Sequence, residues 1–165
     1  MQPKIWVQLS ETIEKFYNAY DGFVILHGSD TMAFTASALS FMLENLNKPV
    51  ILTGSQLPFG VPRTDAKENL ITAIEIASSY RDGVPEVPEV TIYSEYQLYR
   101  GNRTHKVNAD HFEAFVSANF PTLAGAVFHL KFNRRYCRKV NNETLQVHSK
   151  MNANIVVLKL FPGIT

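Results

Sequence analysis

The stretch Gly22-Phe-Val-Ile-Leu-His-Gly-Ser-Asp-Thr-Met32 decides the fold class of this chain. Its four apolar residues, 23–26, predict a short buried strand. Residues 27–28 predict a turn, because glycine permits a sharp backbone bend and a close approach. The polar residues 29–31 then begin a helical pattern that continues to about residue 46. A strand, a glycine turn and polar residues at a helix start are typical of ligand sites in α/β sheets.

The start of this predicted helix carries charges of both signs. The helix N-terminus offers unpaired N–H groups and a partial positive charge, and Asp30 adds a negative charge beside them. Such a site suits a zwitterion better than a bare phosphate, which Asp30 would repel. The simpler alternative is that Ser29 or Asp30 only caps the helix, since both residue types are preferred N-caps.

A second apolar run, residues 50–52, ends in a similar way, with Thr53-Gly54-Ser55-Gln56. Polar loops that follow successive parallel strands lie at the same edge of a sheet, where ligands bind in such folds. We therefore expect the two loops to lie at one edge. Taken alone, residues 53–56 are interpreted as a packed turn.

Strands alternate with helices along the chain, which predicts an α/β fold with a three-layer, mainly parallel, flavodoxin- or Rossmann-like sheet and helices on both faces. The predicted helices cover residues 3–20, 30–45 and 65–79, and the predicted strands cover residues 23–26, 50–52, 89–93, 125–132, 145–148 and 155–160. Residues 96–106 lack a clear period and are interpreted as a polar loop. The buried faces of the second and third helices are expected at Met32, Ala33, Ala36, Leu39, Leu43 and Leu46, and at Leu70, Ile71, Ala73, Ile74 and Ala77.

Length and composition bound the class of protein but do not name a function. The 165 residues suffice for one domain, and the net charge of +1 gives no electrostatic case for nucleic acid or an anionic membrane. No apolar run approaches the ~18 residues of a membrane helix, and the N-terminus lacks the pattern of a secretory signal. Cys137 is the only cysteine, so no disulfide within the chain is expected. These features favour a cytoplasmic protein.

No metal site is predicted. The five histidines are His27, His105, His111, His129 and His148, and no two of them have the i, i+4 spacing of a zinc-binding helix. Arg100 and Arg103 are interpreted as salt-bridged or packed on Tyr99 rather than as phosphate ligands.

Two motifs resemble the asparaginase/glutaminase family. The first, His27-Gly28-Ser29-Asp30-Thr31-Met32 followed by Thr35-Ala36-Ser37-Ala38-Leu39-Ser40-Phe41, is similar to the second signature of that family. The cytosolic, type I branch usually has His-Gly-Thr-Asp-Thr-Met, so Ser29 stands where the family has threonine. The second motif, Tyr99-Arg100-Gly101-Asn102-Arg103-Thr104-His105-Lys106, resembles the type I segment that carries an essential lysine.

The resemblance implies a set of site residues. Ser29, Asp30 and Lys106 take the positions of the family's hydrogen-bonded triad of Thr, Asp and Lys. Asp30 also takes the position that binds the α-amino group of the substrate, and Ser29 with the Gly28 backbone lines the pocket for the side-chain amide. No cofactor is implied. Without the resemblance, Lys106 would be interpreted as an ordinary solvated loop lysine.

The chemistry that the resemblance implies is physically sound. Asp30 can hold both the lysine and a substrate ammonium. Lys106, if it is desolvated and partly neutral, can accept a proton from the hydroxyl of Ser29. Serine keeps that hydroxyl but lacks the methyl group that stiffens a threonine rotamer, so we expect a weakened role for Ser29, not an abolished one. Thr64 or Asp65 is interpreted as the N-cap of the following helix.

The resemblance covers nearly the whole chain, yet two family motifs are missing from the 165 residues. One is the first signature, Gly-Gly-Thr-Ile-Gly, which carries the nucleophilic threonine. The other is the Asp-Ser-Ser or Asp-Ser-Asn turn that holds the substrate α-carboxylate. We therefore expect a partial N-terminal domain over residues 1–165, without the first strands that carry the nucleophile and without the C-terminal domain, as a gene fragment, the product of a mis-set start codon or half of a split enzyme. Its sheet should have an exposed edge beside residues 23–26.

The resemblance implies an L-asparaginase-type amidohydrolase that converts L-asparagine to L-aspartate and ammonia through a threonine nucleophile outside this chain. It leaves open whether L-glutamine is also a substrate, and it implies a homo-oligomer. One alternative is a catalytically inert fragment or split-enzyme half that only binds. The other is the asparaginase-like subunit of a tRNA-dependent amidotransferase, against which the near-neutral charge argues.

Overall fold

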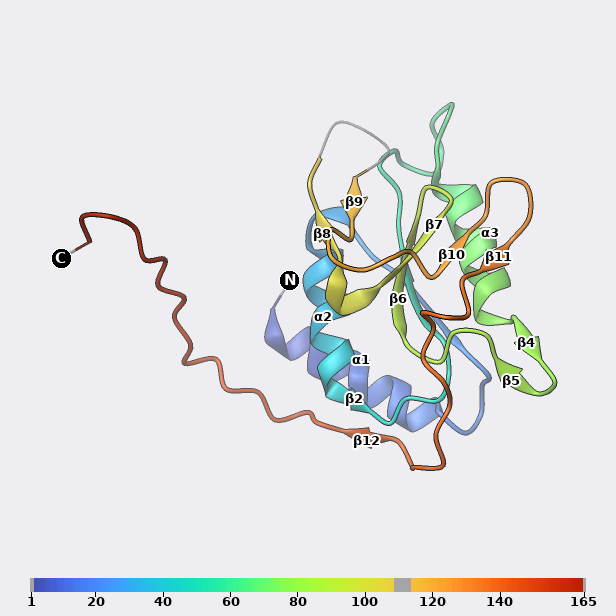
Figure 1. Cartoon of the computed structure of the whole chain (residues 1–165), viewed down its shortest axis with the longest axis horizontal. Helices are drawn as coiled ribbons and strands as arrows, with labels where there is room; N and C mark the ends of the chain where they lie inside the picture. Colours follow the sequence, from blue (N-terminus) through green and yellow to red (C-terminus); the bar gives the residue numbers. More distant parts are fainter. Residues whose placement is uncertain (1, 109–113, 165) are drawn as a thin grey trace.

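The computed structural model describes residues 2–108 and 114–164, and this part of the chain has three α-helices packed around a six-stranded sheet (Figure 1). The α/β fold class is confirmed. The helices are α1 (Pro3–Phe16), α2 (Ser29–Met42) and α3 (Ala66–Ala77), with the 3-10 helix η1 (Gly101–Arg103). The strands of the main sheet are β1 (Phe23–Leu26), β3 (Val50–Thr53), β6 (Val90–Ser94), β7 (Gln97–Arg100), β10 (Ala124–Gly125) and β11 (Lys131–Phe132). Short pairs are β2 (Leu43–Glu44) with β12 (Gln146–Val147), β4 (Tyr80–Arg81) with β5 (Val84–Pro85) and β8 (His105–Lys106) with β9 (Phe115–Val116).

The sheet is mixed, so the prediction of a mainly parallel sheet is wrong. β1, β3 and β6 run parallel, but β6 with β7, β7 with β10 and β10 with β11 pair antiparallel. The direction changes at a two-residue hairpin loop, Glu95 and Tyr96, whose φ angles are 47° and 62°. Hairpin loops of this kind favour Asn-Gly or Asp-Gly. Because neither pair is present, residues 96–106 carry no turn signal and read as a loop instead of a returning strand.

Two hydrophobic clusters, one on each face of the sheet, form the core. The residues of β3 alternate between them: Val50 and Leu52 pack with α1 and α2, whereas Ile51 packs with α3. This alternation follows from the two-residue period of a strand. Figure 1 accordingly shows α1 and α2 on one side of the parallel strands and α3 on the other.

The predicted buried face is right for α2 and partly wrong for α3. All of the residues predicted for α2 and its C-terminal end are buried: Met32, Ala33, Ala36, Leu39, Leu43 and Leu46. On α3, by contrast, Ile71 and Ile74 are 54% and 52% exposed. Asn69 is buried instead, because its side-chain amide donates to the Gly54 carbonyl at 2.9 Å and to Asp65 at 3.0 Å. The buried face of α3 comprises Asn69, Thr72, Ala73, Ile76 and Ala77.

β1 is an edge strand and not the fully buried strand that its sequence predicts. Within the described residues β3 is its only neighbour in the sheet. Its first three side chains are half-buried, and Leu26 is 66% exposed. The exposed edge expected beside residues 23–26 is therefore present, with backbone groups available for pairing with another chain.

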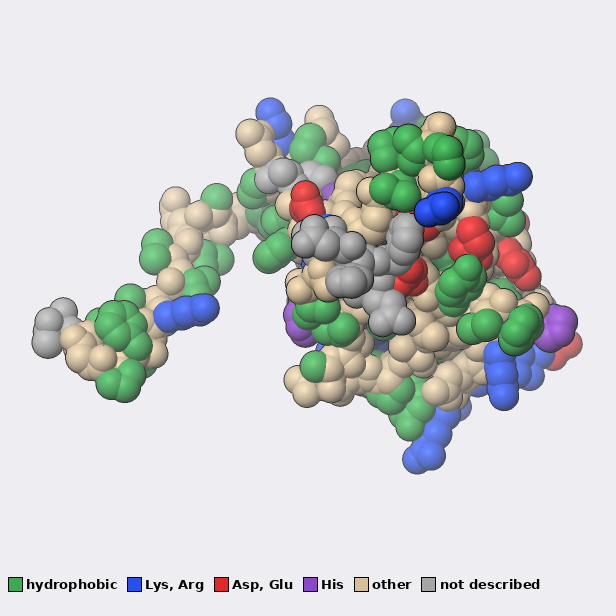
Figure 2. Space-filling model, turned by 90° about the horizontal axis from the view of Figure 1, so that it is seen from above, with side chains coloured by type: hydrophobic (Ala, Val, Ile, Leu, Met, Phe, Trp, Pro, Cys, Tyr) green, Lys and Arg blue, Asp and Glu red, His purple; other side chains and the backbone are tan. Residues whose placement is uncertain are grey.

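Two strand predictions in the last third of the chain are wrong. Residues 125–132 are not one strand, because β10 and β11 flank a hairpin loop in which Phe128 is 92% exposed. Residues 155–160 form no strand, since no partner strand lies beside them in the described part of the chain. They belong to a tail that leaves the body after β12 (Figure 1), and its side chains, largely hydrophobic, stand clear of the body in Figure 2. The short strand predicted at 145–148 is confirmed as β12.

Candidate active site

The turn between β1 and α2 brings two polar side chains to the start of α2. Gly28 occupies the N-cap position with φ −65° and ψ 139°, and no side chain caps the helix. Ser29 and Asp30 are therefore free of the capping role that the simpler alternative assigned to them. Asp30 lies in the first turn of α2, where the helix dipole favours a negative charge.

Lys106 reaches this helix start from β8. Its Nζ atom lies 2.8 Å from Ser29 Oγ and 2.8 Å from Asp30 Oδ1. β8 is held in place by pairing with β9, in which Lys106 lies opposite the buried Phe115. The structure thus brings Lys106 together with two residues that lie more than 70 positions earlier in the sequence.

The two charged side chains differ sharply in exposure. The Lys106 side chain is 13% exposed, whereas the Asp30 side chain is 89% exposed. The hydrogen bond and the charge of Lys106 hold the pKa of Asp30 below its usual value. Only one Asp30 oxygen faces Lys106, so the carboxylate keeps lone pairs on the solvent side for a second cation.

Ser29 links Lys106 to the loop that follows β3. The Ser29 hydroxyl donates to Gln56 Oε1 at 3.2 Å, while its oxygen accepts from Lys106. The hydrogen bonds therefore run from the lysine through the serine to the glutamine. A neutral lysine would reverse the first of them and accept the hydroxyl proton. The arrangement can move one proton between Ser29 and Lys106.

Asp65 fixes the position of Gln56. Its carboxylate accepts from the backbone N–H groups of Gln56 (3.1 Å to each oxygen) and Leu57 (3.3 Å), and from the Asn69 amide at 3.0 Å. Asp65 occupies the N-cap position of α3, as predicted, but its side chain does not cap. Thr64 instead accepts the N–H of Ala66 at 3.1 Å.

The two glycine turns pack directly against each other, as expected for loops at one sheet edge. A Cβ atom on Gly54 would lie 2.1 Å from the His27 carbonyl oxygen, so residue 54 must be glycine for this contact. His27 in turn bonds the Gly28 carbonyl through Nδ1 at 2.7 Å and Thr35 through Nε2 at 2.8 Å. Thr35 also accepts from Trp6 of α1 at 2.9 Å. These contacts hold the turn before Ser29 in one conformation.

The described residues contain no cluster of three or more His, Cys, Asp or Glu side chains that could hold a metal ion. His111, one of the histidines considered above, lies outside the described residues. In the same part of the chain no helix is both long and apolar enough to cross a membrane.

Comparison with known proteins gives the same assignment as the two sequence motifs. The family model described as Asparaginase, N-terminal, matches residues 1–138. The chain belongs to the asparaginase family. It is 47% identical over 165 residues to L-asparaginase 1 of Escherichia coli (strain K12), and 49% identical over 160 residues to the 60 kDa lysophospholipase of Mus musculus. The solved L-asparaginase I of Vibrio cholerae superposes with a TM-score of 0.89 at 43% identity.

The matches cover all or nearly all of this chain but only part of each relative. The whole chain corresponds to 47% of the Escherichia coli protein and 49% of the Vibrio cholerae structure, and 96% of it to 28% of the mouse protein. A glutamyl-tRNA(Gln) amidotransferase subunit of Pyrococcus abyssi is 37% identical over 169 residues, and the match covers the whole chain and 39% of that protein. The chain thus spans half or less of the length of these relatives.

The sequence motifs single out three of the residues that meet at this candidate site but not the fourth. Ser29, Asp30 and Lys106 were singled out from the motifs, and the structure brings their side chains together. Gln56 was interpreted only as part of a packed turn, although it accepts from Ser29. Its signal was its place directly after the second parallel strand, at the sheet edge where the first polar loop lies.

Proposed function

We propose that this chain is the part of an L-asparaginase-type amidohydrolase that binds L-asparagine and moves a proton during hydrolysis of the side-chain amide. The observation that carries the proposal is the position of Lys106 Nζ, 2.8 Å from both Ser29 Oγ and Asp30 Oδ1. A serine hydroxyl beside a lysine that also binds a carboxylate suits proton transfer. The family assignment and the L-asparaginase relatives support the same choice of substrate.

Each residue has a role in this proposal that its surroundings support. The exposed Asp30 carboxylate binds the substrate α-ammonium with the lone pairs that Lys106 leaves free. The Gly28 backbone and Ser29 line the pocket for the side-chain amide. Lys106, nearly buried beside the Ser29 hydroxyl, exchanges a proton with it. No cofactor takes part.

The covalent step needs a nucleophile, and the family resemblance assigns it to a threonine in a signature that these 165 residues lack. Its hydroxyl oxygen attacks the amide carbon, the C–N bond breaks, and the nitrogen leaves as ammonia with the hydroxyl proton. Water then cleaves the acyl ester to L-aspartate and restores the hydroxyl. Ser29 and Lys106 relay the proton that moves in each half of this sequence.

Ammonia release and L-asparagine binding by the purified 165-residue chain test the proposal. We expect binding, detected by NMR chemical-shift changes of Ser29 and Asp30 amides, without turnover by the chain alone. Lys106→Ala should change the response of the Ser29 and Asp30 amides to L-asparagine and weaken its binding. Lys67→Ala, which removes an exposed lysine on α3, should change neither. Ammonia release that Lys106→Ala abolishes would contradict the assignment of the nucleophile to a residue outside the chain. No response to L-asparagine would contradict the proposed substrate.

A second candidate, the asparaginase-like subunit of a tRNA-dependent amidotransferase, has the Pyrococcus abyssi relative in its favour. The two functions differ in RNA binding, because a subunit that binds tRNA needs a basic face, whereas this chain has a net charge of +1. Specific binding of tRNA by the purified chain would favour the alternative. The inert-fragment alternative predicts binding without turnover under every condition, including addition of a separate segment that carries the missing signature.

For the whole protein we further propose a cytoplasmic location, a homo-oligomeric state and a three-layer, flavodoxin-like arrangement of the complete domain. The α2 side chains Phe34 and Phe41, 66% and 72% exposed, supply apolar surface for association. Size-exclusion chromatography with light scattering measures the oligomeric state directly.

A further inference from the structure

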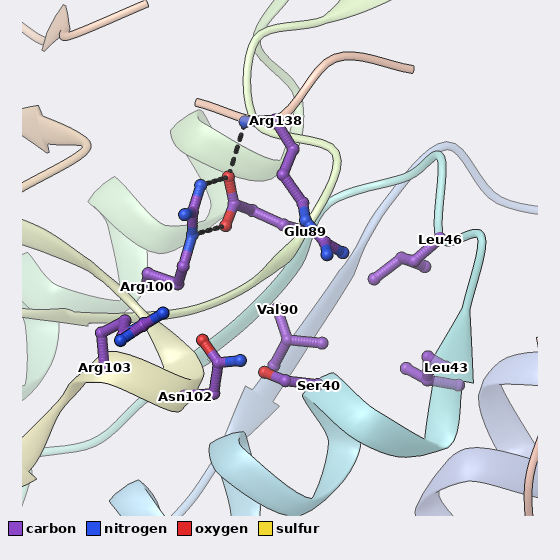
Figure 3. Close-up of a pocket in the computed structure, with 9 residues that line it drawn as sticks. All are labelled: Ser40, Leu43, Leu46, Glu89, Val90, Arg100, Asn102, Arg103 and Arg138. Carbon is purple, nitrogen blue, oxygen red and sulfur yellow. Dashed lines mark hydrogen bonds and ion pairs between the residues drawn. The ribbon is translucent and has the colours of Figure 1, made fainter. Parts of the chain in front are cut away.

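A cavity of about 130 Å³ lies beside η1, away from the site described above (Figure 3). Its walls come from segments far apart in the sequence: the C-terminal half of α2, the start of β6, η1 and the loop that contains Arg138. Leu43, Leu46 and Val90 form an apolar part of the lining, and three arginines line the polar part. A cavity needs only about 10–15 Å³ of such volume to hold one water molecule, so this cavity has room for a small ligand.

One of the three arginines is fully engaged by the protein. Arg100 donates to both oxygens of Glu89, at 2.5 and 3.1 Å, and to the Tyr136 carbonyl at 2.8 Å. Its guanidinium also lies 4.2 Å from the centre of the Phe120 ring. Glu89 is buried, and it accepts the Arg138 backbone N–H at 2.8 Å as well. Arg100 and Glu89 therefore neutralise each other, and neither needs a ligand.

The other two arginines are different. The side chains of Arg103 and Arg138 have no hydrogen-bond or ion-pair partner among the described residues, and both residues are exposed. Figure 3 shows Arg103 reaching in from η1 and Arg138 reaching in from the opposite side, with Asn102 below them. The expectation of a salt bridge thus holds for Arg100 but not for Arg103. Among the described residues that line the cavity, the positive charges of Arg103 and Arg138 thus have no negative partner.

We propose that this cavity binds a small oxyanion of charge −2, held between the guanidinium groups of Arg103 and Arg138. Guanidinium groups match carboxylate and phosphate oxygens with paired N–H donors. The two guanidinium groups have no partners in the described part of the chain, so an anion of charge −2 would balance their charge. The side-chain amide of Asn102 is a further hydrogen-bond donor at the same cavity. The volume admits inorganic phosphate or a dicarboxylate of about four carbons.

Such an anion would add a link between η1 and the loop of Arg138, next to the hydrogen bonds of Arg100 and Glu89 to that loop. Arg103 belongs to η1, which directly precedes Thr104 and β8, whereas Arg138 lies in the loop after β11. Arg138 is well placed because its backbone N–H is already held by Glu89. A ligand that binds only the folded chain raises its stability as its concentration rises above the dissociation constant. Anion binding is therefore measurable both directly and through thermal unfolding.

The test is calorimetric titration of the 165-residue chain with phosphate and, separately, with succinate, at constant ionic strength set by sodium chloride. We expect one site for at least one of the two anions, and a higher unfolding temperature than in chloride alone. The phosphate and succinate arms distinguish the two sources of the charge. Loss of one charged hydrogen-bond donor set weakens such binding about tenfold or more, so Arg103→Gln and Arg138→Gln should each have that effect.

Arg135→Gln is the matched control, because Arg135 is also exposed, its replacement removes the same charge and it does not line the cavity. It should leave the affinity within about twofold. Equal losses in all three variants would overturn the proposal in favour of non-specific charge attraction. Failure of both anions to bind a chain that unfolds cooperatively would overturn it as well. L-asparagine binding is independent of this result, so the proposed function can fail or hold separately.

Discussion

Two ion pairs lie six residues apart on the segment from β7 to β8, and they have opposite surroundings. Arg100 and Glu89 are enclosed, with side chains 19% and 4% exposed, while Lys106 binds an Asp30 side chain that is 89% exposed. Both Glu89 oxygens accept from protein donors. Among the described residues, Asp30 has Lys106 as its single side-chain partner. The first pair is complete without a ligand, and the second leaves a charge open to one.

This contrast shows which physical test separates a structural ion pair from a site. Both pairs involve a carboxylate and a cation at short distance, so distance does not distinguish them. The number of lone pairs left over does, together with their access to solvent. A count of unused N–H donors likewise sets Arg103 and Arg138 apart from Arg100, although all three line one cavity.

The largest effect is expected from breaking the enclosed pair. Arg100→Met leaves the buried Glu89 carboxylate without its cation, and such changes cost about 3–5 kcal/mol. Urea unfolding followed by circular dichroism measures the loss. The control Arg135→Met removes an exposed arginine and should change the free energy of unfolding by no more than about 0.5 kcal/mol.

A double variant sharpens this result. Glu89→Gln combined with Arg100→Met removes both charges, so no unpaired charge remains buried. It should be more stable than Arg100→Met alone, because the cost of the single variant comes mainly from the uncompensated carboxylate. If Arg100→Met destabilises no more than Arg135→Met, the description of this pair as structural is wrong.

The pair of Lys106 and Asp30 is called the open pair here, because the Asp30 carboxylate faces solvent. A change in it should affect ligand binding more than stability. Asp30→Asn removes an exposed carboxylate and leaves Lys106, whose side chain is 13% exposed, without its counter-charge, so the urea midpoint should fall, but by less than in Arg100→Met. L-asparagine binding should fall about tenfold or more, because a charged hydrogen bond to the substrate ammonium is lost. Asp82→Asn, which changes an exposed loop aspartate, is the matched control and should affect neither measurement. A large loss of stability in Asp30→Asn, with binding retained, would assign Asp30 a structural role instead.

Local sequence patterns predicted the parts of the molecule that repeat a simple period. The strand, glycine turn and helix start at residues 22–32 follow from apolar runs and from the backbone freedom of glycine, and the α2 core follows from helical spacing. Lys106 has no such local signal. A single lysine in a polar segment reads as solvated surface, so only the motif resemblance connected it with Ser29 and Asp30.

The failures have physical reasons in particular residues. The Glu95-Tyr96 hairpin lacks the Asn-Gly that marks such loops, so the antiparallel half of the sheet was missed. The α3 face was misjudged because buried Asn69 is satisfied by Gly54 and Asp65, contacts that no helical period encodes. The apolar run at residues 155–160 is strand-like in composition, but a strand also needs a neighbour.

The smallest effect expected is a titration at the open pair. Lys106 lowers the pKa of Asp30 from its ordinary value of 3.8, so the folded state holds the Asp30 proton less tightly than the unfolded state does. The contribution of the pair to the free energy of unfolding is fully present above pH 3.8. It is lost as the pH falls through the lowered pKa of Asp30 in the folded state. Lys106→Met should move the pKa of Asp30 back toward 3.8, and Lys67→Met should not. The carboxyl carbon chemical shift of Asp30, followed by NMR through the acid range, measures this change.

Salt distinguishes this titration from a purely local hydrogen-bond effect. The part of the lowered Asp30 pKa that comes from the charge of Lys106 should become smaller in 1 M sodium chloride, where the screening length is only about 3 Å. The hydrogen bond between Lys106 and Asp30 is the larger cause of the lowered pKa, so most of the difference between the parent chain and Lys106→Met should persist in salt. An Asp30 titration that is the same in both chains would mean that the 2.8 Å contact is not formed in solution, and the open pair would then lose its place in the site.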